Sequence, residues 1–195
     1  MPKKNDKAAS GKRDQLIDTA LRLFARQGYR ATGIDSILAE AGVAKMTLYH
    51  HFKSKDELIV AALRRRDTEW REWFIGRVAK LAGTPRERLL AVFNVMQEWF
   101  RNKDYHGCSF GRAATEFRDP KHSAHKMASE HKRQMLAYFR ELAAAAGAKD
   151  PDLLAQQISL LVEGAVIHME VFREPQVARI ADEAAQKLVD QALKR

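Results

Sequence analysis

Helix start and stop signals divide the chain into short segments, and no segment shows the period-two alternation of a β-strand. A proline is tolerated at the first position of a helix, and a polar residue such as Thr or Asp before it can cap the free backbone amides. Four of the five prolines fit this pattern, at Thr84-Pro85, Asp119-Pro120, Asp150-Pro151 and Glu174-Pro175. Gly28 and Gly147 stand where a left-handed residue would end a helix. The chain is therefore expected to be all-α.

Capping boxes mark further helix starts, because a Ser or Thr and an acidic residue three positions later can each cap the other's amide. The candidate boxes pair Thr84 with Glu87, Ser54 with Glu57 and, in a weaker version, Thr32 with Asp35. Together these signals predict about nine helices, with ends defined to within about two to four residues. The predicted helices span residues 12–27, 33–41, 45–52, 55–81, 85–102, 109–118, 121–146, 151–173 and 175–194.

Positive charge gathers in the N-terminal third of the chain. The 195 residues carry 34 Lys and Arg against 25 Asp and Glu, a formal net charge of +9. Residues 1–66 hold 14 of the basic and 7 of the acidic residues, whereas residues 67–195 hold 20 and 18. Such asymmetry points to a polyanionic partner, either nucleic acid or an anionic membrane surface. Without a lipid or an amphipathic anchor, the membrane is the weaker alternative.

The chain carries one cysteine, Cys108, which excludes an intrachain disulfide and suits a reducing compartment. Residues 1–11 are basic and polar, and no apolar stretch follows them as in a secretory signal. No apolar run is long enough to span a bilayer. We therefore expect a cytoplasmic protein with a disordered basic arm over residues 1–11.

Residues 12–52 can form three helices, of which the last two are joined by a tight turn. Gly42 permits the turn, and Val43 closes the core beneath it. In the third helix Leu48 and Phe52 lie four residues apart, so they share one face and can anchor it. This pattern predicts a helix-turn-helix over about residues 33–52, whose second helix can enter the major groove of DNA.

The remaining side chains of this short helix suit contacts with duplex DNA. Lys45 can donate to a guanine edge or a phosphate, and Thr47 offers a hydroxyl and a methyl group. Tyr49 and His50 can reach phosphate oxygens, and His50 can also reach a base edge. The free amides and positive dipole at the starts of the neighbouring helices favour phosphate. The predicted DNA contacts are Thr32, Gly33, Lys45, Met46, Thr47, Tyr49, His50, Lys53 and Lys55.

A resemblance to the DNA-binding domain of the tetracycline-repressor (TetR) family covers residues 13–58, RDQLIDTALRLFARQGYRATGIDSILAEAGVAKMTLYHHFKSKDEL. It includes the AGV turn, the TLYHHF recognition helix and the KSKDEL start of the next helix. Two positions depart from the family pattern. Ala44 stands where a capping serine is usual, which would cost about 1 kcal/mol of local stability. Met46 stands where a small residue is common, and it can touch a thymine methyl or fold back onto the protein.

The resemblance implies a three-helix DNA-binding domain over residues 12–58 and a C-terminal helical bundle for ligand binding and dimerisation over residues 59–195. The implied function is a transcriptional regulator, by default a repressor, that binds a near-palindromic operator as a homodimer. A small, hydrophobic or aromatic inducer would bind the C-terminal domain and release the DNA.

Large apolar, sulfur and polar side chains of the C-terminal helices are the candidates for that inducer site, although each apolar one alone also suits an ordinary core. They are Trp70, Phe74, Phe93, Met96, Trp99, Phe100, Cys108, Phe110, Glu116, Met127, His131, Met135, Glu163 and His168. The last two helices carry more apolar surface than one chain would leave uncovered. The implied dimer interface comprises Leu154, Ile158, Leu161, Val162, Ala165, Met169, Val177, Ile180, Ala184 and Leu188.

Two other functions stay open. Cys108, in the segment HGCSFGRAATEF of residues 106–117, can make the chain a thiol sensor or, with nearby histidines, a metal sensor. A small buried cysteine is the simpler interpretation. Alternatively, the chain is an architectural DNA-binding protein without a ligand. No catalytic constellation, phosphate loop or paired carboxylates stand out, so we expect no enzyme, no cofactor and no bound metal.

Overall fold

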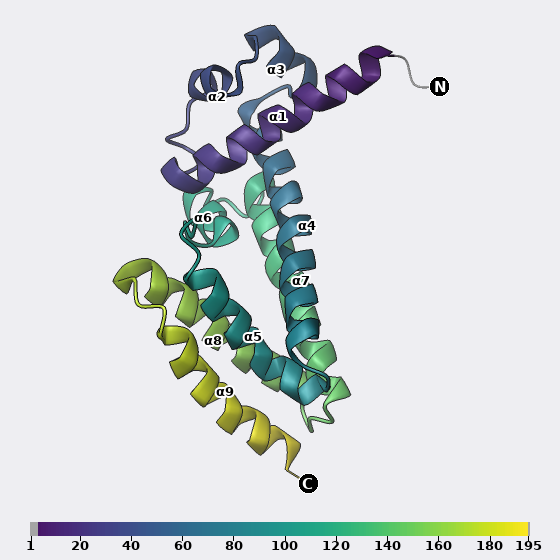
Figure 1. Cartoon of the computed structure of the whole chain (residues 1–195), viewed down its shortest axis with the longest axis vertical. Coiled ribbons are helices and arrows are strands. Elements are labelled where there is room, and N and C mark those ends of the chain that lie inside the picture. Colours follow the sequence, from purple (N-terminus) through teal and green to yellow (C-terminus); the bar gives the residue numbers. More distant parts are fainter. Residues whose placement is uncertain (1–3, 195) are drawn as a thin grey trace. The chain divides into compact units, whose positions relative to one another are not determined.

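The computed structural model describes residues 4–194, and this part of the chain forms nine helices and no strand (Figure 1). The all-α class is confirmed. None of the described helices is both long enough and apolar enough to cross a membrane. The helices are α1 (Lys4–Gln27), α2 (Ile34–Ala41), α3 (Lys45–His51), α4 (Lys55–Leu81), α5 (Pro85–Phe100), α6 (Ser109–Glu116), α7 (Ser123–Ala145), α8 (Pro151–Phe172) and α9 (Val177–Leu193).

The largest difference from the predicted helices lies at the N-terminus, where α1 begins at Lys4 rather than near residue 12. The segment expected as a disordered arm is therefore helical from Lys4 onward, and residues 1–3 lie outside the described residues. Residues 4–12 contain no proline that would break the helix, although Gly11 and the polar Asn5, Asp6 and Ser10 among them are weak helix formers. Extending an existing helix is also easier than starting one.

Two of the four expected proline starts are confirmed. Thr84 and Asp150 cap α5 and α8 through their side chains, and a proline follows each at the start of the helix. The other two proline pairs fall before the helices, and α7 and α9 begin only at Ser123 and Val177. A proline's fixed φ suits the second position of a turn as well as the first turn of a helix. The proline pattern therefore shows that a helix begins nearby, but it does not fix the first residue of that helix.

The helices pack into two compact units. The first comprises residues up to Glu69 together with Ser109–Glu130, and the second comprises Trp70–Cys108 together with the residues from His131 onward. This division differs from the boundary predicted at residue 58. It differs because α6 and the first part of α7 pack with the N-terminal helices, although more than 50 residues separate them from α3 in the sequence.

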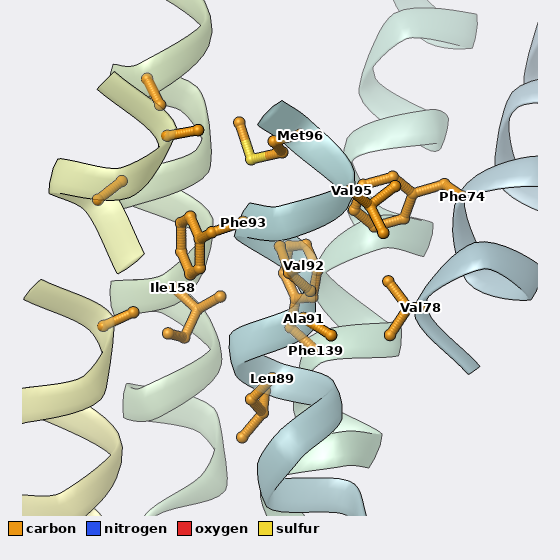
Figure 2. Packing of buried hydrophobic residues seen from close by; sticks show 14 of the residues in the cluster. Phe74, Val78, Leu89, Ala91, Val92, Phe93, Val95, Met96, Phe139 and Ile158 are labelled. Carbon is orange, nitrogen blue, oxygen red and sulfur yellow. The ribbon is translucent and has the colours of Figure 1, made fainter. Parts of the chain in front are cut away.

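The core of the second unit is formed mainly by α5, α8 and α9, with side chains added from α4 and α7. Figure 2 shows Phe93 and Val95 of α5 in this buried cluster with Phe74 and Ile158. None of these four side chains is more than 1% exposed, and burying such a side chain contributes about 1.5–3 kcal/mol. The second unit therefore has its own hydrophobic core.

In the first unit, Glu116 of α6 closes the C-terminal end of α1. Its carboxylate accepts hydrogen bonds from the backbone amides of Tyr29 at 3.1 Å and Arg30 at 2.7 Å. Gly28 makes room for it, because a Cβ at this residue would lie 2.7 Å from Glu116 Oε1, and its φ of 91° is strained for other residues. Arg112 donates to two carbonyls in the last turn of α1. These contacts attach α6 to the helix that supports the DNA-binding helices.

We expect Glu116→Ala to lower the free energy of unfolding by about 1–3 kcal/mol, because two amides lose a charged acceptor. Urea denaturation followed by circular dichroism would measure the loss. Thr115→Ala is the matched control, since Thr115 is exposed and its hydroxyl bonds to carbonyls of its own helix. If Glu116 instead served a ligand, as the sequence suggested, its removal would leave the stability of the ligand-free protein unchanged.

Candidate nucleic-acid interface

A glycine turn joins α2 to α3. Gly42 ends α2 in the left-handed conformation, with φ 61° and ψ 37°. The amides of Gly42 and Val43 donate to carbonyls of the last turn of α2, at 3.3 and 3.2 Å. Ala44 then precedes α3 with no side-chain cap, as its sequence requires. Two helices of eight and seven residues are thus joined by a turn of three.

Apolar side chains hold α3 against the rest of the first unit. Leu48 is 0% exposed, Phe52 3% and Val43 8%, so the predicted inward anchoring of this helix is confirmed. The guanidinium of Arg13 lies 5.2 Å from the centre of the Phe52 ring and covers it. The side-chain amide nitrogen of Gln15 in α1 donates to the Ala41 carbonyl at 2.8 Å, which fixes the end of α2. Helix α1 therefore supports both helices of the motif.

The opposite face of α3 is presented to solvent. Met46 is 80% exposed and Tyr49 46%. Lys45 and His50 are also exposed, and Thr47 is half-buried. These five side chains are the ones of α3 among the nine residues predicted to meet DNA. Burial of the apolar anchors leaves them on a rigid, accessible helix face.

The side chain of Thr32, one of the predicted DNA-contact residues at the start of α2, is turned inward. It is 0% exposed, and its hydroxyl donates to the Gly28 carbonyl at 2.7 Å. Gly33, rather than Thr32, is the N-cap residue of α2, and no side chain caps this helix. The weak capping box expected here is therefore wrong, because the Thr32 hydroxyl is turned toward the core. What the start of α2 can offer an anion is its backbone amides beside the exposed Gly33.

The start of α4 carries the two predicted lysines in different surroundings. Ser54 accepts the Glu57 amide at 3.2 Å, and the Glu57 carboxylate accepts the Lys53 amide at 2.7 Å, one residue before the expected partner. The Lys53 side chain is exposed. The Lys55 ammonium donates to the Arg30 carbonyl at 3.1 Å, and burial lowers its pKa. Lys53 is therefore better placed than Lys55 to meet a phosphate.

The candidate inducer-binding residues are divided between the units. Phe110, Glu116 and Met127 belong to the first unit and the others to the second. The Glu116 carboxylate is engaged by backbone amides and is not offered to a ligand. Six of the second-unit candidates are buried, namely Phe74, Phe93, Met96, Phe100, His131 and Met135. The half-buried ones are Trp70, Trp99, Cys108, Glu163 and His168.

Half of the residues predicted for the dimer interface lie inside a single chain. Leu154, Ile158, Ala165, Met169 and Val177 are buried in the second unit's core. Leu161, Val162, Ala184 and Leu188 are half-buried, and Ile180 is 54% exposed. The exposed apolar residues of α8 are others: Leu153, Leu160, Ile167, Val171 and Phe172, at 52–72%. Because α8 is apolar around most of its circumference, its sequence does not reveal which apolar face turns inward.

A short, anchored helix that presents polar side chains after a glycine turn defines a DNA-binding protein of the helix-turn-helix class. Comparison with known families agrees. The model of the family described as bacterial regulatory proteins, tetR family, matches residues 16–62. The model described as the tetracyclin repressor-like C-terminal domain matches residues 85–185. The chain belongs to the TetR family of DNA-binding transcriptional regulators.

Individual relatives extend this result over most of the chain. The crystal structure of a TetR-family transcriptional regulator from Streptomyces coelicolor is similar with a TM-score of 0.87 and 29% identity, covering 95% of this chain and 97% of that one. The HTH-type transcriptional regulator YjdC of Escherichia coli is 27% identical over 161 residues, 83% of this chain and 84% of the relative. The HTH-type transcriptional repressor KstR2 of Mycolicibacterium smegmatis is 34% identical over 87 residues, 43% of this chain and 40% of the relative. These relatives are named as regulators and not as enzymes.

Neighbouring residues of α3 provide a test of this interface. We expect Leu48→Ala to destabilise the protein by about 2–5 kcal/mol, because it empties a fully buried position. Tyr49→Ala should leave stability within about 0.5 kcal/mol, because the side chain is 46% exposed, and should weaken DNA binding. Urea denaturation and fluorescence anisotropy with a duplex would separate the two effects. Equal DNA affinity of Tyr49→Ala and the unchanged protein would place the contact surface elsewhere.

Proposed function

We propose that the protein is a transcriptional repressor that binds a near-palindromic operator as a homodimer and is released by a small molecule bound in its second unit. The anchored α3 with its exposed Lys45, Met46, Tyr49 and His50 is the observation that carries this proposal. The KstR2 relative is named a repressor, which supports repression rather than activation. The protein would act in the cytoplasm, beside the chromosome.

The exposed apolar stripe of α8 supports the homodimer. Leu153, Leu160 and Ile167 are seven residues apart, so they follow one another along one face of the helix, and Val171 lies one turn further on. The exposed Gly164 between them would permit a close approach of two helices. Ile180 of α9 adds a further exposed apolar side chain. A two-fold pairing of the α8 face would cover its exposed apolar side chains and join two recognition helices in one dimer. Operator half-sites one turn of DNA apart would be spaced by about 34 Å.

Buried polar atoms without partners support a ligand site in the second unit. Among the described residues, the indole nitrogen of Trp70, the hydroxyl of Tyr105 and Nδ1 of His168 are buried there without a hydrogen-bond partner. Leaving such a group unpaired costs about 1–3 kcal/mol, so each favours a ligand that supplies its partner. The second unit can thus bind a molecule that combines aromatic or apolar surface with hydrogen-bonding atoms.

The connections between the units offer a route for regulation. The chain passes from one unit to the other within α4 after Glu69, before α6 after Cys108, and within α7 after Glu130. Trp70, Cys108 and His131 are all candidate ligand residues, and each stands directly at one of these passages. A ligand that favours one arrangement of these residues would shift the population of DNA-competent dimers. We propose that helix α4 transmits most of this change from the second unit to the first.

The metal-sensing alternative has less support. Within the described part of the chain, no group of three His, Cys, Asp or Glu is arranged to hold a metal ion. His122, which precedes α7, and His125 in its first turn are engaged in other contacts. His122 lies 3.3 Å from the Asp56 carboxylate, and His125 lies 2.8 Å from the Phe117 carbonyl.

Salt dependence tests the operator-binding proposal. On a duplex selected from a random library, affinity should fall about 10³–10⁵-fold between 50 and 200 mM salt if the dimer makes six to ten phosphate contacts. Lys53→Ala should reduce the salt slope by about one for each protomer. Lys149→Ala is the matched control, because Lys149 is exposed but lies in the second unit. Failure to select any duplex, or a slope near zero, would contradict operator binding.

Light scattering tests the homodimer. We expect Leu160→Glu to yield monomers and to weaken operator binding, because Leu160 is 72% exposed in the chain and a buried carboxylate would oppose pairing. Leu81→Glu is the matched control. Leu81 is also an exposed leucine, at 43%, but it is the last residue of α4 and does not belong to the α8 stripe. A Leu160→Glu protein that remains dimeric would show that this face does not form the interface.

A further inference from the structure

The thiol of Cys108 lies next to an ion pair of Lys132 and Glu163, two residues far from it in the sequence. The Lys132 ammonium is 3.6 Å from the Cys108 sulfur and 2.6 Å from a Glu163 carboxylate oxygen. Burial alone would lower the pKa of Lys132, but the charges of Cys108 and Glu163 outweigh it and raise this pKa. Lys132 therefore stays an ammonium, and it stabilises negative charge that forms at or next to the sulfur.

The backbone at Cys108 is held in place by Glu170 of α8. The Glu170 carboxylate accepts the Cys108 amide at 2.7 Å. It also passes so close to Gly107 that a Cβ there would lie 2.5 Å from its oxygen, and Gly107 has a φ of 85°. Only a glycine fits this conformation and this approach without strain. The half-buried thiol is thus presented from a fixed position.

A row of aromatic side chains in contact with one another begins at Tyr105, three residues before Cys108, and two of them carry hydrogen-bond donors without a partner. Tyr105 is 7% exposed, its hydroxyl has no hydrogen-bond partner, and burial and the charges of Glu170 and Cys108 raise its pKa. Its ring meets Trp99 edge to face at 4.9 Å, and Trp99 meets Trp70 in the same way at 5.8 Å. The buried indole nitrogen of Trp70 is likewise unpaired. Two hydrogen-bond donors on aromatic walls suit a planar molecule with carbonyl oxygens.

We propose that this cluster of Cys108, Lys132, Glu163, Tyr105 and Glu170 is a covalent sensor site for planar, conjugated carbonyl compounds such as quinones. The thiol gives its proton to solvent, and the sulfur attacks the β-carbon of the acceptor. A carbon–sulfur bond forms while the carbon–carbon π bond breaks, and its electron pair moves to the carbonyl oxygen. Lys132 stabilises this enolate, and solvent returns the proton. The addition consumes no oxidant or reductant.

This inference rests on the proposed function, because it names the ligand class and the regulatory event of the second unit. Cys108 is the last residue of the second unit before the chain enters α6 of the first. The Lys132 side chain stands just after the passage within α7. An adduct on Cys108 would separate Lys132 from the sulfur and would displace the residues at two of the three passages. Alkylation is therefore expected to release the operator.

The test treats the full-length protein with methyl-1,4-benzoquinone and follows the intact mass. We expect one adduct for each chain, located on the peptide that contains Cys108 and absent from Cys108→Ser. Lys132→Met should slow the addition about tenfold, and Lys132→Arg should restore most of the rate. Iodoacetamide is the matched reagent, because its displacement reaction forms no enolate and should depend less on Lys132.

Anisotropy with the selected operator provides the second readout. The adduct of the unchanged protein should lose the operator, whereas Cys108→Ser treated in the same way should retain it. A rate no higher than that of N-acetylcysteine, or one unaffected by Lys132→Met, would overturn the site. An adduct that leaves operator binding unchanged would overturn the regulatory step. Absence of operator binding before treatment would instead contradict the proposed function, while the mass measurement would still test the chemistry.

Discussion

Burial of Leu48 and Phe52 is the interaction on which the DNA-binding surface depends. An isolated helix of fewer than about 12 residues is marginal in water, and α3 has seven. Ala44 also gives this helix no side-chain cap. Its conformation must therefore come from packing against α1 and α2, with Arg13 covering the Phe52 ring. The same packing decides which side chains face solvent, so the stability of α3 and the set of side chains that it can offer to DNA have one physical origin.

A second set of contacts makes α6 part of this DNA-binding unit. Glu116 accepts the backbone amides of Tyr29 and Arg30 just after α1, and Arg112 donates to carbonyls in the last turn of α1. The helix that positions the recognition motif is therefore fixed at its C-terminal end by a segment that follows directly after Cys108. Chemistry at Cys108 has a short covalent path to these contacts. In the regulation proposed above, an adduct on Cys108 would act on these contacts through the adjoining helix α6.

The sequence predicted where the helices lie better than which face of each helix is buried. Cap signals, glycines and the four-residue spacing of Leu48 and Phe52 are local, and they located the helices and the recognition helix. The inward face of α8 depends on which neighbours it meets, and its near-continuous apolar surface carries no such information. As a result Leu154 and Ile158 were assigned to the dimer interface, although they lie in the core. Leu160 and Ile167, which are exposed, were not among the residues assigned to it.

Long-range polar contacts account for the other differences. Glu116 appeared as a polar group in a ligand domain, because nothing in its own segment shows that it binds amides 86 and 87 residues earlier. The sequence did not indicate a role for Lys132 or Tyr105, because a lysine in an amphipathic helix and a tyrosine in a loop are common and carry no functional signal by themselves. Cys108 by itself was best interpreted as a small core residue. In the structure it is half-buried and lies 3.6 Å from an ammonium that also pairs with a carboxylate, and this geometry is the basis of the proposed sensor site.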